Sequence, residues 1–299
     1  MFKKLKTFLL SIFILNSSFV GLSKSTQAFG SLSHETITRI AFEKAMKDLE
    51  KQDFEEQTKF MVANCTGPDK DEKSGAGGAY QGHFLDVGDI EVDFMDRKQD
   101  NALKRLDKHF QSAVIAAKND EWRMALYCLA RALHYLQDMC CIVHLWGYTY
   151  NNMSTMHLLD HKEFENIADS MCEHGCKNGL IMDLKGSCCN LKINLSLTPV
   201  ELGRNCAETT YAEFIEQFKH GTLATALNTV VNSVNPLAYA IRAISATVDA
   251  VKGVYSGEVR YYACDTMLTS AVQASYKLIH IFMNNVQEHF KTSKSITYK

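Results

Sequence analysis

The stretch EWRMALYCLARALHYLQDMCCIVH, residues 121–144, decides how the rest of the sequence is interpreted. Residues 121–139 have the amphipathic pattern of a helix, and the Asn119-Asp120 pair before them is a turn and helix-start signal. Residues 98–118, on the other side of this turn, have a similar pattern. We therefore expect two helices that pack antiparallel.

The remaining sequence also favours helices. The chain has 299 residues, of which 46% are hydrophobic and 22% charged, so it can bury one sizeable core. Only three prolines interrupt it. Further helices are expected near residues 33–50, 158–171, 207–219, 222–252 and 264–292. The sequence predicts a single all-α domain with no internal repeat.

Two segments depart from this pattern. Residues 64–82 are polar and rich in glycine, which predicts a long loop. Residues 221–241 carry no charge, which is compatible with a membrane span, but their several Thr and Asn side chains would be costly in hydrocarbon. A buried core helix bent at Pro236 is the favoured interpretation.

The N-terminus is typical of a signal peptide. Three lysines precede an apolar run from Phe8 to Leu22, and a polar stretch then ends at Ala28. The alternative, a retained membrane anchor, is less favoured because the run is short and interrupted by polar residues. We expect residues 1–28 to be removed and residues 29–299 to form a secreted or periplasmic protein.

Charge gives no sign of a nucleic-acid partner. The formal net charge is −2, and it becomes −6 without residues 1–28, which hold four lysines and no acidic residue. A duplex-binding protein carries a basic footprint instead. We expect a monomer without a stable nucleic-acid partner.

The chain contains ten cysteines. An even number in an exported protein favours disulfides, and we expect the cluster from Cys172 to Cys206 to staple a loop-rich segment. A zinc ion held by these thiols is the alternative. However, neither Cys172-x-x-x-Cys176 nor the adjacent Cys188-Cys189 matches a structural zinc pattern.

Histidines and carboxylates recur in pairs at helical spacing. His134 and Asp138 lie one turn apart on one helix face, and His161 and Glu165 repeat this spacing. Each pair alone is compatible with a core histidine or an exposed side-chain pair. Three further residues extend the set, namely Asp69, His83 and His144. Together they favour a zinc cluster, because zinc accepts imidazole and carboxylate ligands and two ions can share a carboxylate.

The order of these residues resembles the zinc-dependent phospholipase C family of bacteria, which includes clostridial alpha-toxin. The resemblance spans about residues 29–170 and is most specific between His134 and Glu165. It implies a single compact helical bundle with three zinc ions at the bottom of a cleft. Because the length after this region is short, we expect the chain to lack the β-sandwich domain of alpha-toxin.

The resemblance also implies three ligand groups and one catalytic residue. The first group would be Asp69, His83, His134 and Asp138. The second would be Phe29, His34 and the shared Asp138, with Phe29 binding through its free α-amine and its carbonyl oxygen. The third would be His144, His161 and Glu165. Asp69 is the candidate base that positions a water molecule.

Two features separate this chain from its relatives. Phe29 stands where the family usually has Trp, and residues 139–143, MCCIV, stand where relatives commonly have proline. Glu165 favours the phospholipases over the related single-strand nucleases, which generally have Asp there. We expect an exported zinc metallohydrolase that cleaves phosphodiester bonds, namely a phospholipase C that releases diacylglycerol and a phosphorylated headgroup from phospholipids at a membrane surface. The alternatives are a single-strand nuclease and a non-catalytic zinc- or lipid-binding protein.

Overall fold

The structure is a computed structural model that describes residues 30–73, 80–85, 100–145, 164–174, 184–189, 191–220 and 257–292. These residues form helices and their connections, without a β-strand among them. The helices are α2 (Ser31–Asp48), α3 (Glu55–Cys65), α4 (Gly67–Lys73), η1 (Tyr80–His83), α6 (Ala102–Lys118), α7 (Trp122–Asp138), η2 (Ile142–His144), α10 (Pro199–His220) and α13 (Gly257–Thr292). Residues 164–174 are also helical. The predicted all-α fold is confirmed.

Helices α6 and α7 form the expected hairpin and make the most extensive contact in the described part of the bundle. Asn101 caps α6, because its side-chain oxygen accepts a hydrogen bond from the Lys104 backbone N–H at 2.9 Å. Asp120 turns the chain with a φ of 61°, a left-handed conformation that aspartate tolerates better than most residues. The local signals at both ends of α6 therefore fix the hairpin.

Helix α10 begins eight residues before the expected start at 207, because Thr198 and Glu201 form a capping box. The Thr198 hydroxyl accepts from the Glu201 N–H at 3.1 Å, while the Glu201 carboxylate accepts from the Thr198 N–H at 2.7 Å. Pro199 occupies the first helical position, where its missing N–H costs nothing. The start of α10 was thus readable from its sequence.

The predicted loop over residues 64–82 is wrong for most of the residues that the structure describes there. Helix α4 occupies Gly67–Lys73, and η1 begins at Tyr80. Pro68 suits the first turn of a helix, and Asp69 in that turn complements the helix dipole. Asp69 therefore has a helical position.

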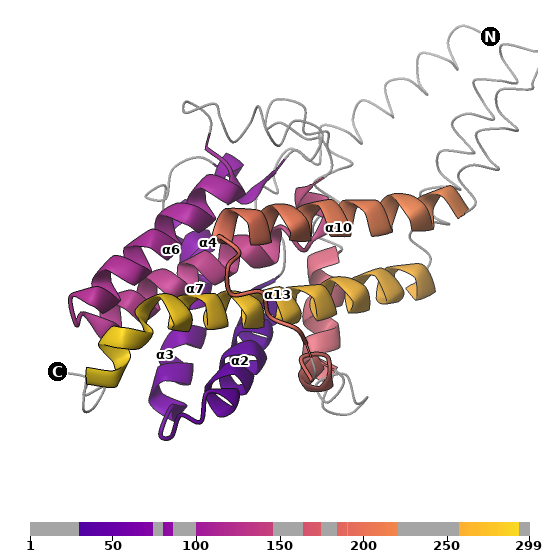
Figure 1. Cartoon of the computed structure of the whole chain (residues 1–299). Helices are drawn as coiled ribbons and strands as arrows, with labels where there is room; N and C mark the ends of the chain where they lie inside the picture. The colour runs from indigo at the N-terminus through magenta and orange to yellow at the C-terminus, as the bar shows by residue number, and fades with distance from the viewer. Residues whose placement is uncertain are drawn as a thin grey trace, which may run out of the picture.

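Helix α13 crosses the bundle and contacts α2, α6, α7 and α10 (Figure 1). Leu268, Val272 and Ile279 on α13 are fully buried and belong to one core with side chains of the hairpin. The largest fully buried side chains of α7 include Leu129, Leu133 and Tyr135. Packing against α13 thus holds α7 and α2, which supply the candidate ligands His34, His134 and Asp138.

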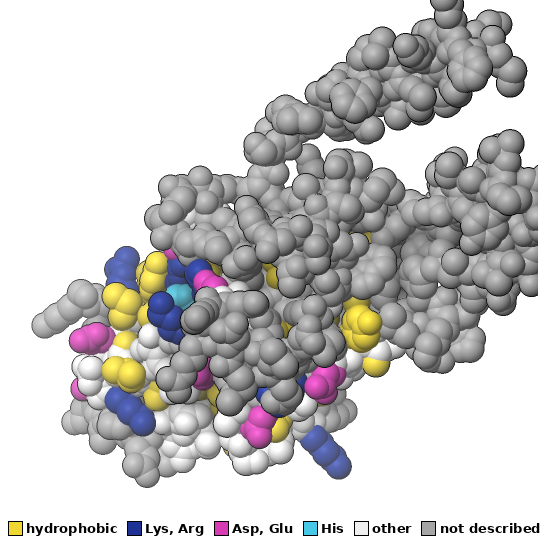
Figure 2. Space-filling view, turned by 90° about the horizontal axis from the view of Figure 1, so that it is seen from above, with side chains coloured by type: hydrophobic (Ala, Val, Ile, Leu, Met, Phe, Trp, Pro, Cys, Tyr) yellow, Lys and Arg dark blue, Asp and Glu magenta, His cyan; other side chains and the backbone are white. Residues whose placement is uncertain are grey.

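The surface carries mixed charge. On the face shown in Figure 2, basic, acidic and apolar side chains of the described residues lie interspersed. No helix of the described part is long and apolar enough to cross a membrane. The signal peptide expected at residues 1–28 and the core helix expected at 222–252 lie outside the described residues.

Nine of the ten cysteines fall in the described part, and no disulfide joins any two of them. The disulfides expected between Cys172 and Cys206 are therefore not present among the described cysteines. Cys176 lies outside the described residues.

Candidate metal centre

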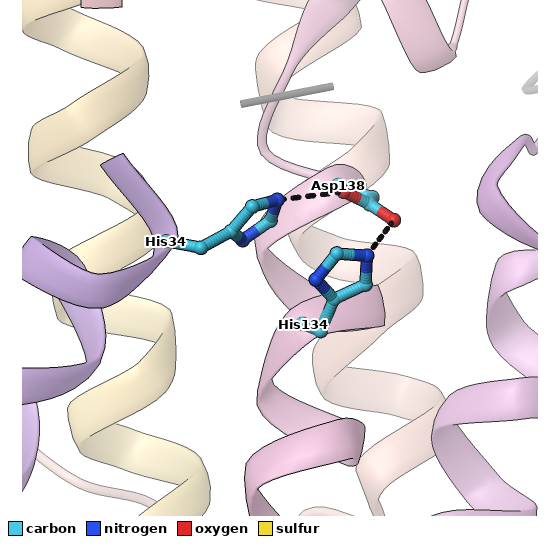
Figure 3. A group of neighbouring side chains, drawn as sticks. All are labelled: His34, His134 and Asp138. Carbon is cyan, nitrogen blue, oxygen red and sulfur yellow. Dashed lines mark ion pairs between the residues drawn. The ribbon is translucent and has the colours of Figure 1, made fainter. Parts of the chain in front are cut away.

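Asp138, the last residue of α7, is the centre of the site. Its side chain is fully buried and faces imidazoles from three segments of the chain. Asp138 Oδ2 lies 2.8 Å from His83 Nδ1 and 3.4 Å from His134 Nε2. Asp138 Oδ1 lies 3.5 Å from His34 Nε2, so this one carboxylate lies between His34 and His134 (Figure 3).

Asp69 completes a first ligand group with His83, His134 and Asp138. His134 Nε2 lies 3.1 Å from His83 Nδ1 and 3.4 Å from Asp69 Oδ1, while His83 Nδ1 lies 3.9 Å from Asp69 Oδ1. Tetrahedral zinc with bonds of about 2.0–2.1 Å places neighbouring ligand atoms about 3.3 Å apart. The distances within the first ligand group lie on both sides of this value.

His34 contributes to a second group that shares Asp138. Its Nδ1 lies 2.6 Å from the side-chain oxygen of Gln137, and the Gln137 amide nitrogen donates to the hydroxyls of Thr38 at 3.0 Å and Ser275 at 3.2 Å. Because the amide donates to both hydroxyls, its oxygen must accept from His34 Nδ1–H. His34 Nε2 then turns its lone pair toward Asp138, as a metal ligand with this kind of support does.

His144 belongs to the expected third group and is oriented in a similar way. Its Nδ1 lies 2.6 Å from the backbone oxygen of His83, which can only accept a hydrogen bond. The Phe84 ring stacks on His144 with centroids 4.4 Å apart. The proton on Nδ1 leaves Nε2 of His144 basic and able to bind a metal.

The buried oxygens of this site fit a cation. Both carboxylate oxygens of Asp69 and Oδ1 of Asp138 lack a hydrogen-bond partner among the described residues, although they are buried. An uncompensated buried charge is strongly unfavourable. Imidazole nitrogens and carboxylate oxygens are ligands that zinc accepts, so the donor set fits this ion.

The charges of the site act oppositely on its two stacked histidines, His34 and His134, whose ring centroids lie 4.1 Å apart. Burial and the neighbouring His134 lower the pKa of His34 to about 4. Burial would also lower the pKa of His134, but the Asp138 and Asp69 carboxylates outweigh it and raise this pKa to about 9. Burial opposes ionisation of Asp69 and Asp138, yet the adjacent imidazoles, His134 first, hold both carboxyl pKa values below their usual range.

Contacts between α4 and α7 hold Asp69 over His134. Arg131 of α7 forms an ion pair with Asp71 of α4. Gly67 allows the close approach, because a Cβ there would lie 2.6 Å from Arg131 Nη1. Arg131 lies one helical turn before His134 on α7. These contacts therefore fix the short helix that carries Asp69 beside His134.

Asp169 holds the start of α2 against the helical segment 164–174. Its Oδ1 accepts from the Ser33 backbone N–H at 2.8 Å and from the Ser33 hydroxyl at 2.6 Å. A Cβ on Gly30 would collide with the same carboxylate. Since Glu165 lies four residues before Asp169, one helix carries a candidate ligand and the contact that fixes the α2 start near His34.

Most of the predicted ligands therefore lie in one place. The structure brings together His34, Asp69, His83, His134 and Asp138. His144 lies beside His83, with ring centroids 6.4 Å apart, and Glu165 is buried. Phe29 and His161 lie outside the described residues, so their roles stay predictions.

Sequence reasoning missed Gln137 and Asp169. Gln137 lies three residues after His134, and Asp169 lies four residues after Glu165, so helical spacing placed each near a predicted ligand. Glutamine is not a usual zinc ligand, and Asp169 has no histidine at helical spacing in the sequence that would mark it as part of a ligand pair. Their partners, Thr38, Ser275 and Ser33, come from distant parts of the sequence.

Comparison with known proteins settles the fold. No family model matches the sequence, and no curated protein sequence is detectably similar. Alpha-toxin of Clostridium perfringens, from avian strain SWCP, matches with 16% identity and a TM-score of 0.51, over 89% of this chain and 66% of the toxin. The chain has the fold of the part of this alpha-toxin that it matches.

A second alpha-toxin, from Clostridium absonum, gives the same result. Its identity is 16% and its TM-score 0.51, over 93% of this chain and 68% of that toxin. This chain thus spans about two thirds of the length of the toxins it matches. The family resemblance read from the ligand order is confirmed at the level of the fold.

Proposed function

We propose that this chain is an exported zinc-dependent phosphodiesterase of the phospholipase C type. The observation that supports it best is the convergence of Asp69, His83, His134 and Asp138 at distances suited to one zinc ion. His34 adds a second group that shares Asp138. The chain that holds these residues shares its fold with clostridial alpha-toxins. The matched alpha-toxins are phospholipases C.

Each side chain of the site has a definable task. Zinc ions, when bound, act as Lewis acids toward a phosphoryl group and its attacking water. Asp69 is buried, and the adjacent imidazoles favour its ionised form. Its carboxylate can therefore coordinate zinc or accept a proton. Gln137 orients His34, and the His83 carbonyl orients His144, so neither imidazole has to reorganise to bind a metal.

The substrate class is part of the proposal. The alpha-toxin fold and Glu165, as the last ligand of the third group, favour phospholipids, and the net charge of −2 offers no electrostatic attraction to nucleic acid. The products would be diacylglycerol and a phosphorylated headgroup. The protein would act as a monomer at the membrane surface, outside the cytoplasm.

Zinc content and two activities test the proposal together. Chains that start at Phe29 should contain zinc and release diglyceride from phosphatidylcholine vesicles. The variant His280→Ala should retain both properties, because His280 packs edge-to-face against Tyr276 of α13 instead of contributing to the site. If the protein degrades single-stranded DNA and releases no diglyceride, it is a nuclease and the phospholipase proposal is wrong. Zinc binding with neither activity would make the protein a non-catalytic zinc protein.

The proposal also assigns the new N-terminus. An α-amine has an unperturbed pKa of about 7.7–8.0 and loses its proton readily beside a cation, whereas an amide nitrogen in an uncut chain has no available lone pair. Gly30 is buried against Asp169, in a segment fixed close to His34. A chain with one extra residue before Phe29 should therefore bind less zinc and be less active. Equal zinc content and activity in the two chains would remove Phe29 from the ligand set.

A further inference from the structure

Arg105 of α6 reaches the short turn that carries His83. Its guanidinium lies against Gly82, the residue before His83, where a Cβ would be 2.9 Å from Arg105 Nε and 3.1 Å from Arg105 Cζ. Helix η1 has only four residues, so its position depends on contacts with the rest of the fold. Arg105 therefore packs on the backbone directly before a candidate ligand.

Tyr135 connects Arg105 to the same ligand. Arg105 Nη1 donates a hydrogen bond to the Tyr135 hydroxyl at 3.3 Å. The Tyr135 ring is fully buried, and its centroid lies 5.2 Å from that of His83 and 5.4 Å from that of His134. The guanidinium thus holds an aromatic ring that packs against two imidazoles of the first ligand group.

Asp100 fixes the orientation of the guanidinium. Arg105 Nε donates to Asp100 Oδ2 at 2.8 Å and to Oδ1 at 3.0 Å, and Nη2 donates to the same carboxylate. Such a pairing defines the plane of the guanidinium and balances its charge. Because an unbalanced positive charge beside the site would repel zinc, the pair supplies geometry and not positive potential.

The chain after His83 is held by backbone hydrogen bonds. The Phe84 carbonyl accepts from the Ala102 N–H at 3.0 Å, and the Leu85 N–H donates to the His144 carbonyl at 2.9 Å. Backbone bonds thus fix the residues after His83, and the Arg105 side chain packs on the residue before it.

We propose that Arg105 is a positioning residue for the first ligand group, and that it holds His83 in place through Gly82 and Tyr135. The proposal rests on the proposed zinc site and adds to it a residue that coordinates no metal itself. Arg131 makes a comparable contact with α4, where it also pairs with an aspartate and packs on a glycine.

Stability and zinc affinity separate a positioning role from a merely structural one. The pair is partly exposed, with 17% of the Arg105 and 35% of the Asp100 side chain accessible, and ion pairs of this kind add little to the stability of a fold. Arg105→Ala should therefore leave the unfolding midpoint of the zinc-free protein nearly unchanged. Contacts that orient a metal ligand have a larger effect on metal affinity, about 10–100-fold.

The test is to titrate zinc into the full-length chain against a chromophoric chelator and to unfold the zinc-free protein with urea. In Arg105→Ala one class of zinc sites should bind about tenfold more weakly. Charge alone predicts the opposite sign, because the substitution removes a positive charge and leaves the Asp100 carboxylate in place. Lys108→Ala removes an exposed positive charge from the same helix and is the matched control, so it should not weaken zinc binding.

Two further variants test the contact itself. Arg105→Lys keeps the charge but not the planar fork, so it should not restore the affinity. The Cβ of Gly82→Ala would displace the guanidinium, so this variant should also bind zinc more weakly. The double variant Gly82→Ala/Arg105→Ala should lose no more affinity than Arg105→Ala alone, because both substitutions remove the same contact.

Unchanged or tighter zinc binding in Arg105→Ala would overturn the proposal. So would additive losses in the double variant, or a fall in the zinc-free unfolding midpoint large enough to account for the lost affinity. Wild-type protein that binds zinc but hydrolyses no lipid would contradict the proposed function and leave the role of Arg105 standing. Wild-type protein that binds no zinc would contradict both.

Discussion

Gln137 and Asp138 are consecutive residues at the end of α7, both fully buried, yet their surroundings differ. The Gln137 oxygen accepts from His34, and its nitrogen donates to Thr38 and Ser275. Asp138 Oδ1, by contrast, has no hydrogen-bond partner among the described residues. Gln137 has its polar atoms paired within the protein, whereas Asp138 turns a charged oxygen toward the lone pair of His34 Nε2.

This difference separates two uses of a buried polar group. A satisfied network such as that of Gln137 fixes neighbouring side chains and contributes to the stability of the fold. The carboxylates of Asp69 and Asp138, by contrast, keep three buried oxygens without a hydrogen-bond partner among the described residues, and a further positive charge would stabilise them. We interpret the first as the support and the second as the binding site of a cation.

The largest effect is expected from Asp138→Asn. The amide removes the charge shared by the first and second ligand groups, so zinc content should fall in both and phosphodiesterase activity should drop at least about a hundredfold. Atomic emission and diglyceride release measure the two quantities. His280→Ala is the matched control, and an Asp138→Asn protein with normal turnover would remove Asp138 from the site.

Asp69→Asn should damage turnover more than metal content. The amide oxygen can still coordinate zinc, but it cannot accept a proton. The zinc content and the turnover number of the same preparation give the comparison. A parallel loss of zinc and turnover would make Asp69 chiefly a ligand and leave the proposed base unassigned.

Much of this site was readable from the sequence because helices fix spacing. His134 and Asp138 lie one turn apart on α7, so their joint orientation follows from the helix itself. The hairpin of α6 and α7 was equally local, since Asn101 and the Asn119-Asp120 turn mark its boundaries.

Contacts between distant segments were not readable in this way. Helix α4 owes its placement to the Arg131–Asp71 ion pair and the approach at Gly67, whereas glycine-rich composition after it suggested a loop. The partners of Gln137 are separated from it by 99 and 138 residues, and no local pattern announces them. Tertiary packing therefore decided both features.

Substitution of Gln137 should show how much its hydrogen bonds contribute to fold stability and how much to zinc affinity. Gln137→Leu leaves His34 Nδ1 and two hydroxyls without their amide partner, which should cost about 1–3 kcal/mol of unfolding free energy in zinc-free protein. Zinc affinity of the second group should weaken about tenfold. Urea unfolding and zinc titration measure these changes.

Gln137→Glu is the matched control for this prediction. Its carboxylate keeps an acceptor for His34 and can accept from the Thr38 and Ser275 hydroxyls, so it should bind zinc better than Gln137→Leu. If the two variants lose zinc affinity equally, the hydrogen bond to His34 does not orient the ligand.

The smallest effect is expected from Asp169→Ala. Loss of the two Ser33 hydrogen bonds at the start of α2 should cost about 0.5–2 kcal/mol, the usual value of a helix-cap interaction. Asp169→Asn keeps a side-chain oxygen acceptor and should lose less. Thermal unfolding of the zinc-free proteins distinguishes them, and equal losses would mean that Asp169 acts through its charge alone.

The convergence of Asp69, His83, His134 and Asp138 on one zinc ion is the central claim, and anomalous X-ray scattering measured on both sides of the zinc absorption edge tests it most directly. The account predicts a zinc peak bonded to all four side chains at about 2.0–2.2 Å, with a second peak between His34 and Asp138. Crystals grown with zinc that show no peak at these residues, with the His134 and Asp138 side chains paired only with each other, would contradict it.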